Sequence, residues 1–338
     1  MPRGPDLTTA TYDVVAIGNA IVDILAQAED RFIDEQGMTK GSMQLIFSPE
    51  DADALYAKMG PGREISGGSA ANTVAGVAAL GGKAGFIGQV ADDQLGQVFA
   101  HDIRAAGVDF TTATRAGEPT TARCLIFVTP DGQRTMNTFL GASQFLPAQA
   151  LDADMIRAGK ILYLEGYLWD PEEPRAAMRE AIRIAREAGR WIAFTLSDVF
   201  CISRHGDDFR QMVADGTIDI LFANENELKA LHKTDDLEEA IAKTTPEVGV
   251  VVVTRSEKGA LAMYQGARWE VAAQPCEAIV DTTGAGDLFA AGVLHGLAQG
   301  RALDHALVQG AICAAEVISH YGARPEADLK ALVAAKLG

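Results

Sequence analysis

The chain has 338 residues, and at about 150 residues per domain this length allows two domains or one large α/β unit. Its formal net charge is −17, which argues against a general nucleic-acid or anionic-membrane binder because an acidic surface repels phosphate. Residues 1–11 contain no apolar signal-peptide core, and no stretch reaches 18 uncharged apolar residues, so we expect a cytoplasmic protein without a membrane partner. The cysteines fit no zinc or redox spacing and are expected to be reduced core thiols: Cys124, Cys201, Cys276 and Cys313.

The first part of the chain alternates strand and helix patterns. Residues 12–17 read as a buried strand, and the apolar run 20–25 that follows is interrupted by Asp23. An N-cap serine, a proline at the first helical position and two acids predict a helix from residue 48 to about residue 58. Small residues over 69–80 predict a second helix, and 83–90 reads as the next strand. This is the rhythm of βαβ units.

The rhythm breaks between residues 108 and 142. Two β-rich runs, 121–129 and 134–140, flank a Pro-Asp-Gly-Gln turn and predict an antiparallel hairpin. With the extended run 42–47, this hairpin would form a small sheet separate from the main one, with lid strands inserted at about 39–47 and 108–142. The sequence shows no linker, so one domain over 1–338 is expected.

From residue 160 onward, strands and helices alternate regularly. Strands are expected at 161–164, 191–196, 218–222 and 250–254, with helices between them and three further helices after residue 284. Such repetition predicts a three-layer α/β/α sandwich around a mainly parallel sheet. Ligands of these sheets bind beyond the carboxyl ends of the strands.

The segment 281–287, Asp-Thr-Thr-Gly-Ala-Gly-Asp, precedes an apolar helix. Residues with little or no side chain at Gly284, Ala285 and Gly286 would leave backbone N–H groups open to an anion, and the helix dipole adds to the attraction. The same dipole is expected to lower the pKa of Asp287, leaving a carboxylate beside a phosphate seat. This pair suits a base that orients a hydroxyl as a phosphoryl group arrives. The alternative is a tight turn with Asp287 as a helix cap.

Two polar positions could read hydroxyl groups of a substrate. Asn72 follows the Gly67-Gly68 pair in the first turn of a small-residue helix, where an amide offers both donors and an acceptor to a polyol. Asp23 could accept hydrogen bonds from two neighbouring hydroxyls. For each residue, a capping or turn role is the alternative.

Asn224-Glu225-Asn226-Glu227 directly follows an expected strand. Its oxygens at the sheet edge could hold waters of a Mg²⁺ ion, and an N-cap with a capping-box acid explains the same letters equally well. The loop 254–259 after the next strand offers a hydroxyl and two cations. The P-loop pattern and a histidine metal motif are both missing from the sequence.

Five motifs in order give the chain its resemblance to a known family. They are 18–23, Gly67-Gly68 through Asn72, 88–96, 224–227 and 281–287, and with them residues 12–335 resemble the ribokinase-like (PfkB-type) carbohydrate and nucleoside kinases. Within the family, 130–142 and 163–170 look most like bacterial adenosine kinases.

The resemblance implies roles for individual residues. Asp287 matches the catalytic base, 284–286 the anion hole, and Arg134 a lid arginine that approaches the transferred phosphate. Contacts to the substrate are implied for Asp23, Gly67, Gly68, Asn72 and Asn137. Contacts to ATP are implied for Asn224, Thr254, Gly259, Gly284 and Gly286. Glu227 would hold Mg²⁺ through water, and Asp281 and Thr283 match a loop that binds K⁺ in several relatives.

The expected function is therefore a Mg²⁺- and ATP-dependent kinase that phosphorylates a primary hydroxyl of a ribose-containing substrate, with adenosine as the first choice. A kinase of a free sugar or sugar acid, of the ribokinase, fructokinase or 2-keto-3-deoxygluconate kinase type, is the alternative. An NAD-type oxidoreductase and a nucleoside-binding regulator without turnover are alternatives of other classes. A homodimer joined through the lid is open at this point, since some relatives use the lid as a dimer clasp.

Overall fold

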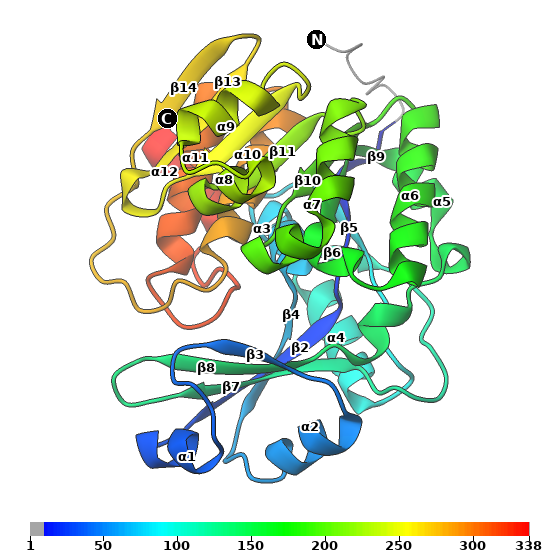
Figure 1. Cartoon of the computed structure of the whole chain (residues 1–338), viewed down its shortest axis with the longest axis vertical. Helices are drawn as coiled ribbons and strands as arrows, with labels where there is room; N and C mark the ends of the chain where they lie inside the picture. Colours follow the sequence, from blue (N-terminus) through cyan, green and yellow to red (C-terminus); the bar gives the residue numbers. More distant parts are fainter. Residues whose placement is uncertain (1–9, 338) are drawn as a thin grey trace.

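The computed structural model of the protein describes residues 10–337, which form two β-sheets with helices around them (Figure 1). The larger sheet has nine strands in the order β14-β13-β12-β11-β10-β9-β1-β5-β6. Every neighbouring pair from β12 to β6 is parallel, and β13 and β14 add an antiparallel edge. The predicted α/β sandwich with a mainly parallel sheet is confirmed, and the β13–β14 edge is an addition that the sequence analysis did not include.

The strands of the large sheet are β1 (Tyr12–Ile17), β5 (Ala84–Ile87), β6 (Val108–Phe110), β9 (Gly159–Glu165), β10 (Trp191–Thr195), β11 (Ile220–Asn224), β12 (Val250–Thr254), β13 (Ala260–Tyr264) and β14 (Ala267–Val271). The second sheet has five strands in the order β3-β8-β7-β2-β4. They are β2 (Ile21–Gln27), β3 (Met43–Ile46), β4 (Arg63–Gly67), β7 (Ala122–Val128) and β8 (Arg134–Phe139). We call this second sheet the lid.

Helices cover both faces of the large sheet. One face carries α3 (Ser69–Ala79), α4 (Gln94–Ala105), α10 (Ala285–Ala298), α11 (Leu303–Val317) and α12 (Leu329–Leu337). The other carries α5 (Ala153–Ala158), α6 (Glu172–Glu187), α7 (Val199–Ala214), α8 (Glu225–His232) and α9 (Leu237–Thr244). Two helices, α1 (Asp30–Glu35) and α2 (Pro49–Tyr56), lie beside the lid (Figure 1). Short 3₁₀ turns are η2 (Gly141–Phe145), η3 (Ala148–Ala150), η4 (Gly166–Trp169) and η5 (Ser256–Lys258).

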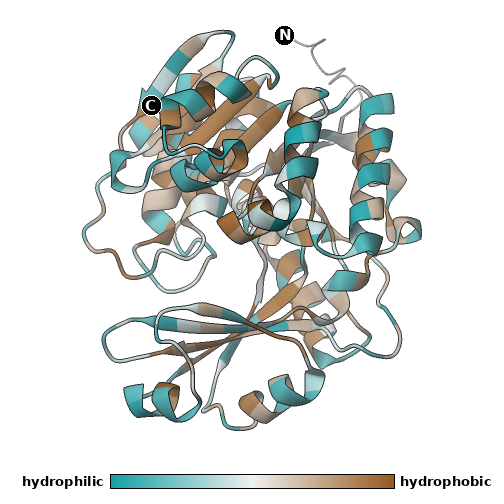
Figure 2. Cartoon of the chain, in the orientation of Figure 1, coloured by the Kyte–Doolittle hydropathy of each residue, from teal (hydrophilic) through white to brown (hydrophobic). Residues whose placement is uncertain are grey.

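The alternation of side chains along each strand separates two apolar cores. In β1, Val14 and Ala16 pack with the α3 and α10 side, whereas Val15 and Ile17 pack with the α5 and α6 side. All four are fully buried, as expected for a central parallel strand covered on both faces. The colouring in Figure 2 follows this arrangement, with apolar strands inside and polar outer faces on the helices around them.

The lid draws on more of the chain than the two expected insertions. Its hairpin β7–β8 is antiparallel and β3 pairs with β8, as predicted. However, β2 and β4 belong to the lid as well, and β6, inside the segment 108–142, is the edge strand of the large sheet. The difference arises because β2 follows β1 across a short corner of three residues, Gly18 to Ala20, which the sequence pattern alone does not reveal.

Three of the four cysteines are buried thiols, as expected, but Cys276 is only partly buried, so the expectation of a core position is wrong for that residue. Among the described residues, no helix combines the length and apolar character needed to cross a bilayer.

Candidate active site

A pocket of about 360 Å³ lies between the lid and the carboxyl ends of the central strands. The large sheet contributes residues from the ends of β9 to β12, including Tyr163, Thr195, Phe222 and Thr254. The lid and the start of α10 complete the wall. The site is therefore beyond the carboxyl ends of the strands, as expected for a mainly parallel sheet.

Asp287 lies in the first turn of α10 and lines this pocket. Its Oδ1 accepts a hydrogen bond from the Ser69 hydroxyl at 2.6 Å, and its Oδ2 accepts one from Asn72 Nδ2 at 3.0 Å. Burial raises the pKa of Asp287, while the hydrogen bonds from Ser69 and Asn72 and the charge of Arg324 lower it in part. The expected lowering of the pKa by the helix dipole is therefore wrong in sign, because desolvation of the carboxylate outweighs it.

The start of α10 presents backbone N–H groups to the same pocket. Gly284 adopts the left-handed conformation at φ 79°, and both Gly284 and Gly286 line the pocket. Within the described part of the chain, no acceptor pairs with the N–H of Gly284, Gly286 or Asp287. The N–H of Ala285 instead donates to the Thr282 carbonyl at 3.2 Å. The unpaired N–H groups at the start of α10 are thus those of residues 284, 286 and 287 rather than of 284–286, and their role as an anion seat stays a prediction.

Asp23 projects from β2 into the pocket on the lid side. Burial raises the pKa of its carboxyl group to about 7, although Arg324 and Arg134 lower it. Among residues 10–337, no side chain or backbone group donates a hydrogen bond to this carboxylate, so its acceptors are available to a ligand. Gly67 lies directly behind it, and a Cβ at Gly67 would come within 2.4 Å of Asp23 Oδ2. A glycine at 67 is therefore required for Asp23 to take this position.

Asn72, in α3, also lines the pocket. Its amide donates to Asp287, while its Oδ1 is buried and has no hydrogen-bond partner. An unpaired buried acceptor costs free energy unless a ligand satisfies it. Gly68 caps α3 at φ 97°, where a Cβ would lie 2.1 Å from the Asn19 carbonyl, so only glycine allows the close turn that places Asn72.

Asn224 and Glu227 line the pocket at the end of β11 and form a reciprocal capping box at the start of α8. The N–H of Glu227 donates to Asn224 Oδ1 at 2.8 Å, and the N–H of Asn224 donates to a Glu227 oxygen at 2.9 Å. Burial raises the pKa of Glu227 to about 7. The capping box that the sequence analysis left open as the alternative is therefore present, and it places the Glu227 carboxylate at the pocket wall.

The side-chain oxygens of Asn224 and Glu227 fit Mg²⁺ only through the waters bound to the ion, not as direct ligands. No group of three or more His, Cys, Asp or Glu side chains in residues 10–337 is arranged to hold a metal. Mg²⁺ keeps most of its waters and is bound largely through substrate phosphates in sites of this kind. Glu227, with lone pairs left beyond its two capping bonds, would hold such waters.

Three other implied residues are not brought to the pocket by their side chains. In β8, Met136 and Thr138 line the pocket, whereas Asn137 points to the opposite face of the lid. The amide of Asn137 contacts Leu125 and Gln44 there, so a substrate contact through Asn137 is not supported. Gly259 forms the turn between η5 and β13 at φ 83° and lies outside the pocket lining. Gly67 also lies outside the lining, and its lack of a side chain leaves room for the Asp23 carboxylate.

Arg134 and Asp281 form a buried ion pair, with Nη1 and Oδ2 2.7 Å apart and side chains 7% and 4% exposed. Asp281 also accepts hydrogen bonds from the N–H groups of Thr283 at 3.0 Å and Gly322 at 2.9 Å. The carboxylate expected to bind K⁺ is thus occupied by a guanidinium group and two amides. The residues at 281 and 283 do not fit a monovalent cation in this arrangement.

The sequence analysis missed three polar residues around the site, of which Glu165 is fully buried and Ser69 and Arg324 are partly buried. Ser69 donates to Asp287, and its only signal was its place three residues before Asn72. Glu165, an acid ending an apolar strand, accepts from both nitrogens of Asn19 and from the N–H of Ala70, each at 2.7 Å. Arg324, which lies in a loop without motif, donates to the carbonyls of Ser66 and Ala71. All three connect segments that are distant in sequence.

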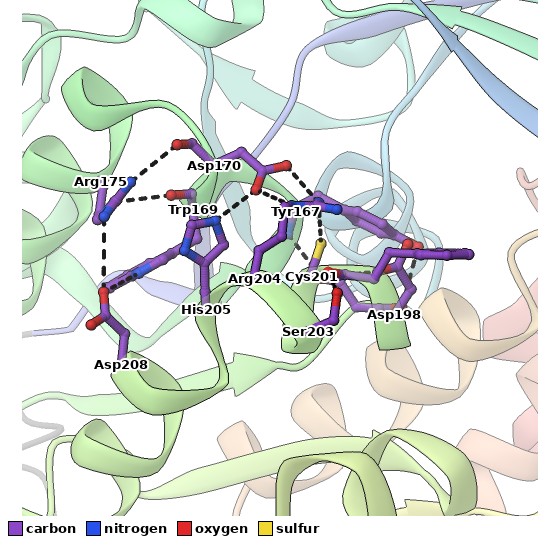
Figure 3. Close-up of polar contacts among 12 residues, drawn as sticks. Tyr167, Trp169, Asp170, Arg175, Asp198, Cys201, Ser203, Arg204, His205 and Asp208 are labelled. Atoms are coloured by element: carbon purple, nitrogen blue, oxygen red, sulfur yellow. Dashed lines mark hydrogen bonds and ion pairs between the residues drawn. The ribbon is translucent and has the colours of Figure 1, made fainter.

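A polar network that includes Tyr167, Asp170, Arg204 and His205 is drawn in Figure 3. It lies next to the part of the pocket wall that Tyr167 and Ser197 form. The Tyr167 hydroxyl donates to the Ser197 carbonyl at 3.2 Å, and Ser197 has φ 72°, which is unusual for a residue other than glycine. Behind them, Asp170 accepts two hydrogen bonds from Arg204, each at 2.7 Å, and contacts His205 at 2.6 Å. The network joins η4 to α7 and holds this wall in place.

Taken together, a buried acid, unpaired helix N–H groups, free acceptors for hydroxyls and a covering lid define a phosphotransferase that acts on an alcohol. Comparison with known proteins agrees. The profile of the pfkB family carbohydrate kinases matches residues 41–329, and the chain belongs to this family of ATP-dependent phosphotransferases. Of the expected classes, the kinase is confirmed and the oxidoreductase and the regulator without turnover are not.

Three relatives illustrate the range within the family. The chain is 48% identical to the adenosine kinase of Sinorhizobium meliloti, with a TM-score of 0.89 and coverage of 97% of this chain and 99% of that one. It is 46% identical to a probable sugar kinase protein of Rhizobium etli, with a TM-score of 0.90 and coverage of 97% and 98%. A fructokinase of Klebsiella pneumoniae is 31% identical over 286 residues, which is 83% of each chain.

Proposed function

We propose that this kinase transfers the γ-phosphoryl group of ATP to the 5′-hydroxyl of adenosine. One observation carries the choice of a nucleoside over a free sugar: the lid face beside Asp23 is mostly apolar, and its one hydroxyl, that of Thr138, donates to Cys124 Sγ. Cys124 pairs across the sheet with Asp23, Ile126 pairs with Met136, and these residues line the pocket with Ile21. A free sugar carries hydroxyls around its ring, whereas a nucleoside has a polar ribose and a flat base that such a wall can cover. The similarity to the adenosine kinase of S. meliloti supports the same choice.

The polar residues then divide the chemistry among themselves. Asp23 and the unpaired Oδ1 of Asn72 would accept hydrogen bonds from ribose hydroxyls, which orients the 5′-hydroxyl toward Asp287. Asp287 would accept the proton of that hydroxyl as the new O–P bond forms. The free N–H groups of Gly284, Gly286 and Asp287 would stabilise the negative charge on the transferred phosphoryl group. Ser69 and Asn72 hold the carboxylate of Asp287 in place throughout.

ATP would bind along the ends of β11 and β12, where Asn224 and Thr254 line the pocket. Mg²⁺ bound to the phosphates supplies charge neutralisation there. Glu227 would orient its waters from the capping box. The two guanidinium nitrogens of Arg134 that lack partners, Nε and Nη2, are buried donors that a phosphate could satisfy. We infer a cytoplasmic location from the requirement for ATP.

A substrate panel tests the acceptor. ADP formation is measured with adenosine, 2′-deoxyadenosine, ribose, fructose and 2-keto-3-deoxygluconate at equal enzyme and Mg·ATP. Burial of a purine against the apolar wall is worth about 3–4 kcal/mol at ~25 cal/mol per Å² over ~150 Å², so kcat/KM for adenosine should exceed that for free ribose by roughly 10²–10³-fold. A higher kcat/KM for fructose would select the sugar-kinase alternative, which the fructokinase relatives support.

Substitutions in the apolar lid wall distinguish binding of a nucleoside base from binding of a free sugar. Ile126→Asn should raise KM for adenosine about tenfold or more, since a polar amide faces the base, and should leave KM for any accepted free sugar within twofold. Val128→Asn, on the same strand outside the pocket lining, is the matched control and should change neither.

We also propose that two copies associate through the lid. Its edge strand β3 exposes Met43 and Leu45, with Phe47 next to it at 87% exposure, on the same face of the extended chain. Phe47→Lys should then convert a dimer into a monomer in sedimentation velocity. A wild-type protein that sediments as a monomer at micromolar concentration would exclude this association.

A further inference from the structure

The contact between lid and core at Arg134 carries a consequence for cation dependence. Arg134 is the first residue of β8, and its side chain extends out of the lid to reach Asp281, three residues before Gly284. The ring of Tyr321 lies 5.4 Å from the guanidinium carbon, and Thr283 Oγ1 lies 3.5 Å from Nη1. The guanidinium is therefore enclosed by the carboxylate, a hydroxyl and an aromatic ring.

Asp281 joins three segments of the active site. Its Oδ1 accepts from the N–H of Thr283 within the loop that leads to the anion seat, and its Oδ2 accepts from the N–H of Gly322 in the C-terminal loop. Ala323 of that loop packs against Gly284, where a Cβ at Gly284 would lie 2.7 Å from Ala323 Cβ. A buried carboxylate in this position needs a positive charge beside it.

That charge comes from within the chain. We propose that Arg134 takes the place of a monovalent cation at Asp281, so that phosphoryl transfer by this enzyme does not depend on K⁺. A second cation beside the same carboxylate, about 4 Å from the guanidinium, would meet like-charge repulsion that weakens its binding on the order of 10³-fold at an effective dielectric constant of about 20. Because Arg134 belongs to the lid, the positive charge reaches Asp281 only when the lid is in place.

The proposal rests on the proposed phosphoryl transfer for its rate measurement but not for its stability measurement. Initial rates with the acceptor selected by the substrate panel are compared in KCl, NaCl and tetramethylammonium chloride at equal ionic strength. The wild-type rate should agree within twofold in all three salts. A rate at least tenfold higher in KCl than in tetramethylammonium chloride would overturn the proposal.

Melting temperature, measured without acceptor or ATP, gives the independent test. K⁺ should not shift the melting temperature of the wild type, whereas Arg134→Met should melt lower in tetramethylammonium chloride and recover in part in KCl. Arg134→Lys retains the charge and should show no K⁺ effect. An Arg134→Met variant that shows no response to K⁺ in melting temperature or rate contradicts the proposal, because loss of a phosphate contact alone predicts that result.

Two further variants keep the test interpretable. If Arg134→Met does not fold, the double variant Arg134→Met/Asp281→Asn removes both charges and should fold with no response to K⁺; a K⁺ response in it would place the cation elsewhere and overturn the proposal. Arg186→Met is the matched control because it breaks another Arg–Asp pair, Arg186–Asp219 with 2.8 Å between Nη1 and Oδ2, away from the pocket. It should lower the melting temperature without any response to K⁺.

Discussion

Asp287→Asn separates catalysis from stability in a way that the geometry of the carboxylate predicts. The substitution keeps the shape of the side chain and its hydrogen bond from Ser69, but it replaces Oδ2 by an NH₂ group that cannot accept the substrate proton or the hydrogen bond from Asn72 Nδ2. The unpaired Oδ1 of Asn72 can accept from this NH₂ group once the Asn72 amide turns over, so the contact between the two side chains is kept. Loss of a general base lowers kcat by about 10²–10⁴-fold, which corresponds to ~3–5.5 kcal/mol of transition-state stabilisation. Because burial raises the pKa of Asp287, the native fold disfavours its ionised form, so a neutral amide should leave the free energy of unfolding unchanged or slightly increase it.

The assay pairs two measurements on one preparation. ADP formation at saturating substrate gives kcat, and thermal unfolding monitored by circular dichroism gives the melting temperature. Asp236→Asn is the control, because an asparagine caps a helix as well as the aspartate at the start of α9 does, so both quantities should stay at wild-type values. If Asp287→Asn retains a kcat within tenfold of wild type, or loses activity only because it unfolds, the assignment of Asp287 as the base is refuted.

Three further outcomes follow from the same site. Burial raises the pKa of Asp23 to about 7, so kcat/KM should fall as the pH drops below 7 and the carboxyl group loses its role as acceptor. Asp23→Asn should lower kcat/KM overall and leave only the part of this acid limb that the raised pKa of Asp287 produces. The free energy of unfolding should change with pH in the opposite direction. Burial raises the pKa values of Asp23, Glu165 and Glu227 to about 7, from ordinary values of 3.8 for Asp and 4.5 for Glu, so the folded state binds more protons than the unfolded state between these values. The urea midpoint of unfolding should therefore decrease from pH 5 to pH 8. Gly284→Ala should lower the free energy of unfolding by about 1–2 kcal/mol or more, because alanine disfavours the left-handed backbone and its Cβ would collide with Ala323. Gly286→Ala should melt like wild type, since its Cβ meets nothing within 4 Å, but it should lose turnover because the methyl group enters the proposed anion seat. Equal melting temperatures for the two variants would contradict this distinction.

The sequence predicted the elements best where a pattern is local. The N-cap serine at 48 and the proline after it mark the start of α2, and the Ser48 hydroxyl accepts from the N–H of Asp51 as such a cap should. The Pro-Asp-Gly-Gln turn likewise predicts the β7–β8 hairpin, since turn residues and strand alternation act over a few positions. The extent of the lid was not predictable in this way, because β2 pairs with β4 about 40 residues away and with β7 about 100 residues away.

The same division holds for the active site. Motifs identify Asp287, Asn72 and Asp23, since each lies beside glycines or a helix start that can be read from the letters. The direction of the pKa shift of Asp287 could not be predicted from the sequence. The dipole of α10 is a local property, whereas the burial of the Asp287 side chain depends on α3 and the lid. For Asn224 and Glu227, the sequence left a capping role and a site role as alternatives. The structure shows that these residues form a capping box and also line the pocket.

By itself, the order of residues determined the succession of strands and helices, the glycine-rich start of α10 and the class of reaction, because hydrophobic periodicity, glycine conformations and helix ends are properties of short stretches of chain. Only the tertiary structure decided which charges meet. The pairing of Arg134 with Asp281, the three amides around Glu165 and the reach of Arg324 into the loop at Ser66 join residues that are up to 258 positions apart. Electrostatic interactions depend on distance through space and on exclusion of water, and neither quantity exists until the chain has folded.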